Sequence, residues 1–358
     1  METEMKRILS VDDSAVLKGV AIICIVLHNF CHWLPGCAVE NEYVFLPDRI
    51  SRFVSLLTHR ADVLLNIFSF AGHYGVAVFL FLSGYGLVRK YEVGNDVVAI
   101  RRFMWYNIKK LWWLLCPALI LWFVSDMYLH QWHWSHHWYN VVQLVTFTGN
   151  LFPGTDLLLG PWWYFSLTIQ LYLVYRLFLY KRGWIPLGVI TSLCMGTMVL
   201  ALCMHNMALL EYFRYNFIGS MLPFALGITM ARTSIYYDWT YAGICFVVWI
   251  ACWFDAMSWL AAPVFFILAI MPLVGVRGVF RKVIIWVGEL SAFLFVVHPI
   301  VRPYLIQNVK AGGNSYVSLM IYLICAFVMA MLYRIVVTRL KGYLISSDIL
   351  TRGDRMGK

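Results

Sequence analysis

The sequence predicts an all-α membrane protein, a bundle of about ten transmembrane helices with both chain ends in the cytoplasm. Hydrophobic residues make up 62% of the 358 residues and charged residues only 13%, whereas about a quarter of the residues of a soluble globular domain are charged. Apolar segments long enough to cross a bilayer recur along the whole chain. The basic residues between these segments are also distributed unevenly. These three observations define the fold class.

The apolar segments give the predicted helices in order. They lie near residues 14–34, 66–88, 108–129, 162–180, 184–204, 214–232, 239–254, 257–275, 283–301 and 315–337. The first lacks the small-residue cleavage site of a signal peptide, so we expect it to remain as a helix. No intervening segment is polar and long enough for a separate soluble domain. We therefore assign residues 1–345 to one transmembrane domain and residues 346–358 to a cytoplasmic tail.

The positive charges predict the orientation. With ten spans and a cytoplasmic N-terminus, 22 of the 28 Lys and Arg residues lie on the cytoplasmic side. This asymmetry follows the positive-inside rule. The formal net charge of +10 therefore marks a membrane surface and lipid contact, and we expect no nucleic-acid partner. The first outer loop, about residues 35–65, contains Glu40 and Glu42 and is predicted to include an amphipathic helix.

Lysine and histidine side chains interrupt the first apolar segment. Lys18 and His28 are ten residues apart, which is about 15 Å along a helix, and they share roughly one face. Lys18 lies toward the cytoplasm, where helix-end lysines commonly extend to the interface. His28 lies deeper, where ionisable residues are costly and usually functional. A core histidine bonded only to the backbone is the alternative.

Polar residues also lie in other predicted spans. Ser83 is in the inner half of the second span, where small residues also permit close helix packing. Ser166 and Gln170 lie near the outer end of the fourth span with Trp163, a residue type that also forms aromatic belts. His298 lies near the outer end of the ninth span. Their depth predicts one polar site in the outer half of the membrane.

A second group of polar residues is expected at the inner membrane surface. Its members are all cations: Lys18, Arg89, Lys90, Lys109 and Lys110. Phosphate groups bind to such cations, and a neutral imidazole such as that of His28 is a suitable general base for a hydroxyl group. The two groups together fit a substrate with an anionic end in the cytoplasm and a reactive end deep inside the protein.

Five segments, in order, resemble motifs of the acyltransferase-3 family of integral membrane acyltransferases. They are "LKGVAIICIVLH", "GVAVFLFLSGYGL", "NIKKLWWLLCP", "GPWWYFSLTIQLYL" and "LSAFLFVVHP". The resemblance implies a ten-helix protein that transfers an acyl group, commonly acetyl, from cytoplasmic acyl-CoA to a hydroxyl of a glycan or lipid-linked saccharide. It also implies that His28 is catalytic. We therefore expect a multi-pass protein of the bacterial plasma (inner) membrane.

Some family positions differ in this chain. The family has ten residues between a basic residue and the catalytic histidine, whereas nine separate Lys18 from His28. Lys110 takes the place of the first of two arginines in the third span, and Trp113 takes the second. Lys109 or Arg102 is then the candidate for the second cation.

These observations predict direct acyl transfer, in which His28 takes the proton of the acceptor hydroxyl as that hydroxyl attacks the thioester. Ser166, Gln170 or His298 would donate hydrogen bonds to the acceptor or the oxyanion, and an acyl-enzyme intermediate on Ser166 is an alternative. Trp163 and Gln170 are the predicted acceptor contacts. The predicted acyl-CoA contacts are Lys18, Ser83, Arg89, Lys109 and Lys110. Asp126 is a candidate to orient His28.

Two other functions fit parts of the sequence. A transporter or flippase for an anionic or sugar-linked substrate would also place polar residues within ten spans, but no internal symmetry or matching pair of broken helices is visible. A zinc site could include His133 and His137 of the second outer loop, which are four residues apart. That loop offers no obvious third ligand, so we expect no metal. The sequence does not predict an oligomeric state.

Overall fold

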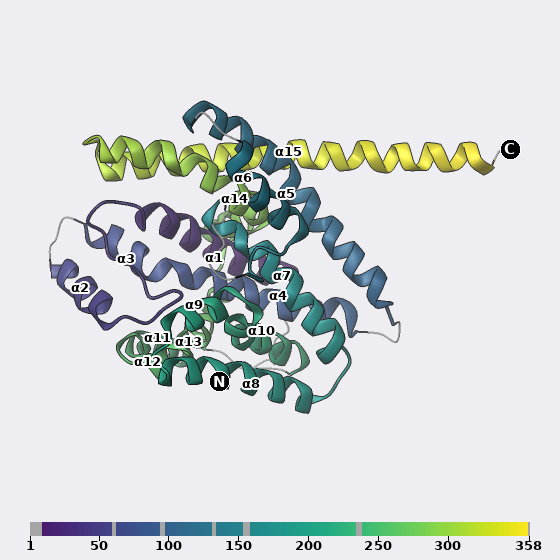
Figure 1. The fold of residues 1–358 in the computed structure, drawn as a ribbon. Helices are drawn as coiled ribbons and strands as arrows, with labels where there is room; N and C mark the ends of the chain where they lie inside the picture. The colour runs from purple at the N-terminus through teal and green to yellow at the C-terminus, as the bar shows by residue number, and fades with distance from the viewer. Residues whose placement is uncertain are drawn as a thin grey trace.

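The computed structural model describes residues 9–58, 62–93, 97–130, 134–152, 158–233 and 238–356. All regular structure in these ranges is helical, as predicted (Figure 1). Six helical segments there are long and apolar enough to cross a membrane. They are α1 (Val11–Cys31), α3 (Val63–Ala71) continued through η1 (Gly72–Tyr74) into α4 (Gly75–Tyr91), α5 (Ile100–His130), α8 (Trp184–Cys203), α14 (Gly278–Lys310) and α15 (Ser315–Met356).

Shorter apolar helices account for the remaining predicted segments. They are α7 (Trp163–Val174) with η2 (Gly160–Trp162) and the π-helical η3 (Tyr175–Leu179), α10 (Phe217–Arg232), α11 (Trp239–Ala251) with η4 (Cys252–Phe254), and α13 (Ala262–Ile270) with η5 (Met271–Gly275). Every predicted segment thus coincides with helical structure. The exact number of membrane crossings and the cytoplasmic position of both chain ends stay predictions.

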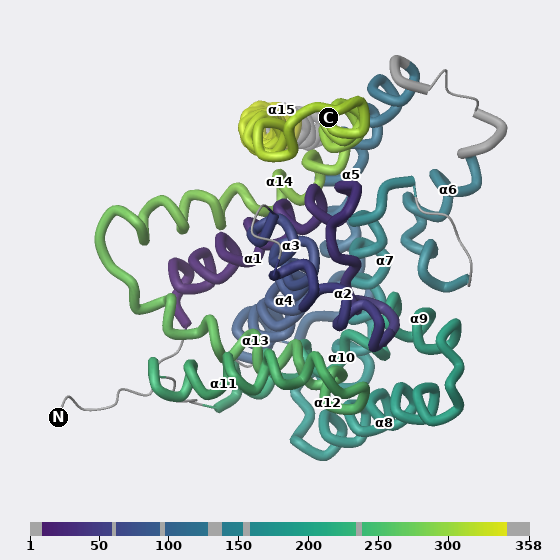
Figure 2. The backbone as a smooth tube through the Cα atoms, turned by 90° about the vertical axis from the view of Figure 1, so that its left-hand side faces the viewer, coloured from purple at the N-terminus to yellow at the C-terminus, as the bar shows by residue number. Residues whose placement is uncertain are grey.

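Four further helices connect the apolar segments: α2 (Pro47–Thr58), α6 (Trp134–Thr146), α9 (Met207–Tyr215) and α12 (Ala256–Trp259). The first of them, α2, is the amphipathic helix expected in the first outer loop, and it buries Ile50 and Phe53. In both views α4 lies in the middle of the bundle, between α8 at one edge and α15 at the other (Figures 1 and 2). α15 continues without a break past residue 346.

Glycines allow two pairs of helices to approach closely at the centre. A Cβ atom at Gly288 of α14 would lie 1.9 Å from the carbonyl oxygen of Ala15 in α1. A Cβ atom at Gly84 of α4 would lie 2.2 Å from the carbonyl oxygen of Phe224 in α10. Any larger residue would therefore separate these backbones. Gly84, next to Ser83, thus serves the close packing that the sequence allowed for.

Two ion pairs join the same helices near their ends. Arg281 of α14 donates to Asp13 of α1 at 2.9 Å. Arg232 of α10 donates through Nε and Nη2 to the two carboxylate oxygens of Glu92, the residue that follows α4. Both pairs are largely buried, so they fix the register of α1 against α14 and of α4 against α10.

Candidate active site

A cavity of about 180 Å³ lies beside His28 at one end of α4, and we call it the His28 cavity. Its walls come from α1, the loop that follows α1, η1, the start of α7, and α14. Polar and aromatic side chains dominate them. They include His28, Asn29, His32, Trp33, Glu40, Glu42, Tyr43, His73, Trp163, Tyr164, Tyr215 and Arg302. Such a concave, polar and aromatic site has the character of a binding pocket.

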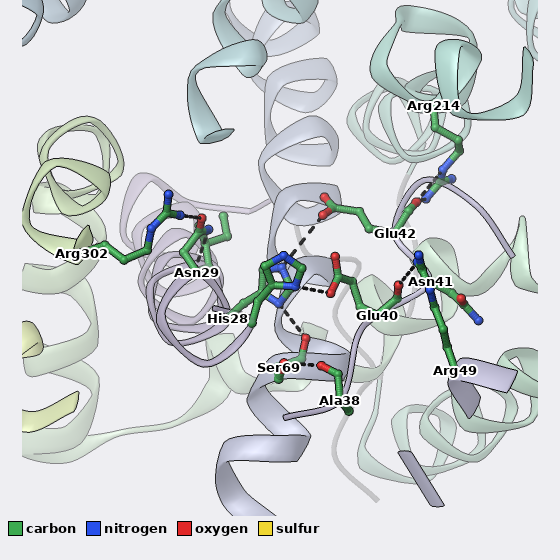
Figure 3. Close-up of polar contacts among 12 residues, drawn as sticks. His28, Asn29, Ala38, Glu40, Asn41, Glu42, Arg49, Ser69, Arg214 and Arg302 are labelled. Carbon is green, nitrogen blue, oxygen red and sulfur yellow. Dashed lines mark hydrogen bonds and ion pairs between the residues drawn. The ribbon is translucent and has the colours of Figure 1, made fainter. Parts of the chain in front are cut away.

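The hydrogen bonding of His28 assigns its tautomer. Its Nδ1 atom lies 2.9 Å from the carbonyl oxygen of Ser69 in α3, and a carbonyl oxygen can only accept (Figure 3). Nδ1 therefore carries the proton and Nε2 keeps a free lone pair. Nε2 faces the carboxyl group of Glu42, whose Oε2 atom is 3.9 Å away. The imidazole is thus oriented as a general base.

The loop after α1 places two carboxyl groups at this histidine (Figure 3). Arg49 donates to the carbonyl oxygen of Glu40, and Arg214 donates twice to the carbonyl oxygen of Glu42. These bonds hold the backbone, so both side chains reach the cavity. The carboxylate of Glu40 accepts from His32 Nδ1 at 2.5 Å.

Glu40 and Glu42 differ in ionisation. Burial raises the pKa of Glu42 to about 8, and the nearby negative charge of Glu40 adds to this effect. Burial also acts to raise the pKa of Glu40, but its hydrogen bond with His32 and its attraction to His28 and His32 when these rings are protonated outweigh it and lower that pKa to about 2. At neutral pH the site therefore contains one carboxylate and one carboxylic acid.

The elements behind His28 pack tightly against it. The ring of His73 in η1 lies 5.7 Å from the ring of His28. A Cβ atom at Gly72 would lie only 2.7 Å from Cβ of His28. His28, His32 and Glu40 also bring three ligand atoms within 4.8 Å of one another, a spacing that suits a metal ion. The hydrogen bonds to Ser69 and between His32 and Glu40 explain the same positions without one.

The structure places only some of the predicted outer residues at the cavity. Trp163 lines it. Ser166 lies at a separate small cavity beside Gln143 and Trp162. His298 is fully buried, its Nδ1 bonded to the carbonyl oxygen of Leu294, and it is not among the lining residues. A similar predicted depth therefore does not make either residue part of the cavity wall. His298 lies on the same face of α14 as the lining residues Phe295 and Arg302, but its ring is fully buried.

Two further candidates also lie away from the cavity. The amide of Gln170 donates to Asn216 and accepts from the backbone N–H of Phe217, so it joins α7 to the start of α10. Asp126 of α5 does not line the His28 cavity. The contacts of His28 come instead from Ser69 and Glu42. The second outer loop histidine, His133, and the side chain of His137 lie outside the described residues.

A second pocket, of about 720 Å³, lies at the opposite end of α4, and we call it the Lys90 pocket. It is lined by Lys90, Tyr91, Val97, Val98, Ala99, Arg102, Phe103 and Tyr106. The Lys90 ammonium lies 4.2 Å from the ring centre of Tyr106 and 5.0 Å from that of Tyr91. Cations and aromatic rings thus meet in one open pocket.

The predicted cations gather near this pocket but do not all line it. The charges of Lys18 and Lys110 interact, as do those of Lys110 and Lys90. Lys109 instead lies over the ring of Trp105 at 4.9 Å. Arg89 is exposed in the last turn of α4. The chosen cations thus form one positive region, within which Lys90 and Arg102 line the pocket itself.

Aromatic side chains connect the two pockets. Tyr91 contacts Phe103 with ring centres 4.9 Å apart, and Phe103 contacts Tyr172 at 6.2 Å. Tyr164 lies eight residues earlier on α7, about 12 Å away along the helix. Its hydroxyl group lies near Ser83, and the ring lines the His28 cavity. Ser83, one of the predicted contacts of acyl-CoA, therefore lies between the two pockets.

Sequence reasoning did not select four residues of the His28 cavity: Glu40, Glu42, His73 and Arg302. The two glutamates were noted only as loop charges, and His73 begins a span in "GHYG". Arg302 follows the "HP" of the ninth span. A signal existed in each case, because an ionisable residue next to an apolar run requires a polar partner. The sequence does not reveal which partner.

Residues 11–339 match the acyltransferase-3 family model, which is described as an acyltransferase domain. The chain belongs to this family. No match was found among curated proteins or among solved structures. The apolar helices and the family together make the protein a membrane acyltransferase.

Proposed function

We propose that this acyltransferase moves an acyl group, most simply acetyl, from cytoplasmic acyl-CoA to a hydroxyl group of a glycan or lipid-linked saccharide. The observation that carries the proposal is the tautomer of His28, whose bond to Ser69 leaves Nε2 free to accept a proton inside a cavity. The reaction would take place at a bacterial inner membrane, with the His28 cavity toward the outer side.

The donor would bind from the cytoplasm at the Lys90 pocket. Lys90 and Arg102 line that pocket and would contact the phosphates, with Lys18 and Lys110 adding to the positive field. The pantetheine arm would then pass Tyr91, Phe103, Tyr172 and Tyr164 to place the thioester next to His28. Its path is long, because Lys18 and His28 alone are about 15 Å apart along α1.

The chemistry needs one base and no covalent enzyme intermediate. Nε2 of His28 takes the proton as the acceptor oxygen attacks the thioester carbonyl carbon, and the carbon–sulfur bond then breaks. The proton passes from the imidazolium to the departing sulfur, which leaves an ester and free CoA. Glu40, ionised at neutral pH, stabilises the imidazolium through the field at the site. Ser166 lies at another cavity, so direct transfer is the simpler route.

The acceptor would bind between aromatic rings. Trp163 lines the cavity, and the rings of Tyr43 and Tyr215 stack at 4.0 Å beside it. Flat aromatic faces beside polar groups suit the apolar faces and hydroxyl groups of a sugar ring. The cavity volume of about 180 Å³ is close to that of one sugar ring.

The test follows radiolabelled acetyl-CoA into the lipid and glycan fractions of membranes that contain the wild type or His28→Ala. We expect label in the wild-type fractions and none above background in His28→Ala at equal expression. His205→Ala, which removes an exposed histidine, is the control. Wild-type labelling by His28→Ala would refute the mechanism. Movement of a saccharide across the membrane without any label transfer would favour the transporter.

A further inference from the structure

Arg302 supplies a buried positive charge to the His28 cavity. It lies in α14, its exposed fraction is only 8%, and it is one of the lining residues. Its Nη1 atom donates to Oδ1 of Asn29 at 3.1 Å (Figure 3). Its guanidinium also lies 4.8 Å from the ring centre of Trp33. One face of the guanidinium is thus covered, and most of its five N–H donors are left for other partners.

Among the described residues, no carboxylate forms an ion pair with Arg302. The acidic groups of the same cavity, Glu40 and Glu42, lie across His28 and pair with His32 and His28 instead (Figure 3). The nearby phenol of Tyr322 donates to the carbonyl oxygen of Val26 and is uncharged at neutral pH, so it supplies no counter-charge. A buried arginine without a counter-charge is costly, and a ligand that supplies the charge removes that cost.

The position of the guanidinium is fixed before any ligand arrives. Asn29 donates its own amide N–H to the carbonyl oxygen of Ile25 at 3.1 Å, which turns its oxygen toward Arg302. A purely structural role would be to join α14 to α1. Those helices already meet at Gly288 and through Arg281 and Asp13, so the join does not explain why a charge is buried beside the cavity.

We propose that Arg302, held by Asn29 and Trp33, binds an oxyanion carried by the acceptor, so that the acylated saccharide is an acidic one. The oxyanion is a carboxylate, as in a uronic acid, or a phosphate, and a guanidinium fork fits either. His28, Asn29 and Arg302 line the same cavity, so the anion and the reacting hydroxyl would belong to one bound acceptor. The role of the bound saccharide as an acyl acceptor rests on the proposed function. The binding of the anion by Arg302 does not depend on it.

Binding of small probes to the purified full-length protein, without acyl-CoA, tests this subsite. The probes are glucuronate, glucose 6-phosphate and neutral glucose, measured by calorimetry with wild type, Arg302→Gln and Arg302→Lys. Lys310→Gln removes an exposed cation from the same helix and serves as the matched control. We expect at least one anionic probe to bind the wild type at millimolar concentration and about tenfold or more tighter than glucose.

Arg302→Gln should weaken binding of that probe by about 10- to 100-fold, whereas Lys310→Gln should leave it unchanged and Arg302→Lys should keep part of it. The preferred probe distinguishes a carboxylate from a phosphate. Equal binding of charged and neutral probes, no binding of either anion, or an unchanged affinity in Arg302→Gln would overturn the proposal. If Arg302→Gln does not fold, two other measurements test the proposal. Anion binding to the wild type should be lost at high salt, and it should be weaker in Asn29→Ala. Anion binding that is unchanged in both measurements would overturn the proposal.

The same measurement in His28→Ala separates the two proposals. Anion binding should persist there, because His28 is not one of the anion contacts. Anion binding without any acyl transfer by the wild type would refute the proposed function and leave the subsite intact. Acyl transfer that is equally efficient for neutral and acidic saccharides would refute the subsite alone. Arg302→Gln should raise KM for the acidic acceptor and leave kcat within a few-fold. A fall in kcat for every acceptor would instead indicate that Arg302 contacts the negatively charged oxygen that forms on the thioester carbonyl during the reaction.

Discussion

Nδ1 of His28 and the carbonyl oxygen of Ser69 lie 2.9 Å apart, in a bond that joins α1 to α3. Ser69 is itself fixed, because its hydroxyl donates to the carbonyl oxygen of Ala38 at 2.5 Å. The orienting partner of this histidine is therefore a backbone carbonyl in a neighbouring helix. A neutral partner leaves the imidazole free to gain a proton and lose it again.

The close approach of η1 to α1 leads to the first prediction. A Cβ atom at Gly72 would lie 2.6 Å from the carbonyl oxygen of Cys24 and 2.7 Å from Cβ of His28. Gly72→Ala should therefore displace His28 and reduce acyl transfer by about 100-fold, the effect expected of a misplacement of 1 Å. Transfer of label from acetyl-CoA measures this loss, and thermal unfolding shows whether the fold is kept.

Gly86→Ala is the matched control, because nothing lies within 4 Å of a Cβ atom at that position. It should keep activity close to that of the wild type. Equal activities of the two glycine variants would show that the position of His28 does not depend on this contact.

The raised pKa of Glu42 leads to the second prediction. In the unfolded chain this carboxyl titrates near its ordinary value of 4.5, whereas in the folded protein its pKa is about 8. Between these values the folded state binds more protons, so the contribution of Glu42 to stability is greatest below pH 4.5 and falls as pH rises toward 8. The variant Glu42→Gln has no carboxyl group to ionise, so it does not lose stability in this way. Its melting temperature should therefore rise relative to that of the wild type as pH increases from 5 to 8.

Glu40→Gln provides the opposite sign at the neighbouring position. In the folded wild type the pKa of Glu40 is about 2, below the ordinary 4.5. The stabilisation that the Glu40 carboxylate supplies is therefore complete above pH 4.5 and is lost as pH falls toward 2. Glu40→Gln should therefore be less stable than the wild type at every pH above 5, by a constant amount. A difference between Glu42→Gln and wild type that does not change with pH would contradict the burial of a neutral Glu42.

Apolar periodicity was sufficient to predict the helices, because a bilayer forces each apolar segment to satisfy its backbone internally. It also pointed to His28, a lone ionisable residue deep in the first span, as the predicted base. Depth alone did not predict the rest of the site. Ser166 lines another cavity, since depth specifies the turn of a helix and not its rotation. His298 shares a helix face with Arg302 but is buried against its own helix, with Nδ1 bonded to Leu294.

The two glutamates that the sequence did not place at the site lie in the loop that follows α1. Glu40 and Glu42 reach His28 only because Arg49 and Arg214 bind the loop backbone. Arg214 is 172 residues away from Glu42 in the sequence. A contact between residues so far apart in the sequence leaves no periodic pattern that a single sequence could show. Residues near a predicted base, and not the base itself, are thus the hardest to predict.

The Lys90 pocket leads to the third prediction. Arg102 lines the pocket, whereas the neighbouring Arg101 does not. Arg102→Gln should raise KM for acyl-CoA by about fivefold, which is about 1 kcal/mol, because one phosphate contact in an open pocket is lost. Initial rates at varied acyl-CoA concentration measure it. Arg101→Gln should keep the wild-type KM, and an equal rise in both variants would indicate only a general field of positive charge.

The buried ion pair behind this pocket leads to the last prediction. The carboxylate of Glu92 accepts from Arg232, from the hydroxyl of Tyr175 at 3.0 Å and from the backbone N–H of Lys181 at 3.3 Å. It therefore joins α4, α10 and the π-helical η3. Glu92→Gln leaves the Arg232 charge buried without a counter-charge, with only the carbonyl oxygen of Leu179, among the described residues, still bonded to it, and should destabilise the protein by about 3–5 kcal/mol, seen as a lower melting temperature.

Two variants separate this pair from a general effect of charge. Glu211→Gln removes an exposed carboxylate from the connecting helix α9 and should change stability by less than about 0.5 kcal/mol. The double variant Glu92→Leu with Arg232→Leu should be more stable than Glu92→Gln, because it removes both buried charges together and leaves neither unpaired. If Glu92→Gln melted at the temperature of Glu211→Gln, the Arg232 charge would have to be solvated, and the end of α4 would not be held by this pair.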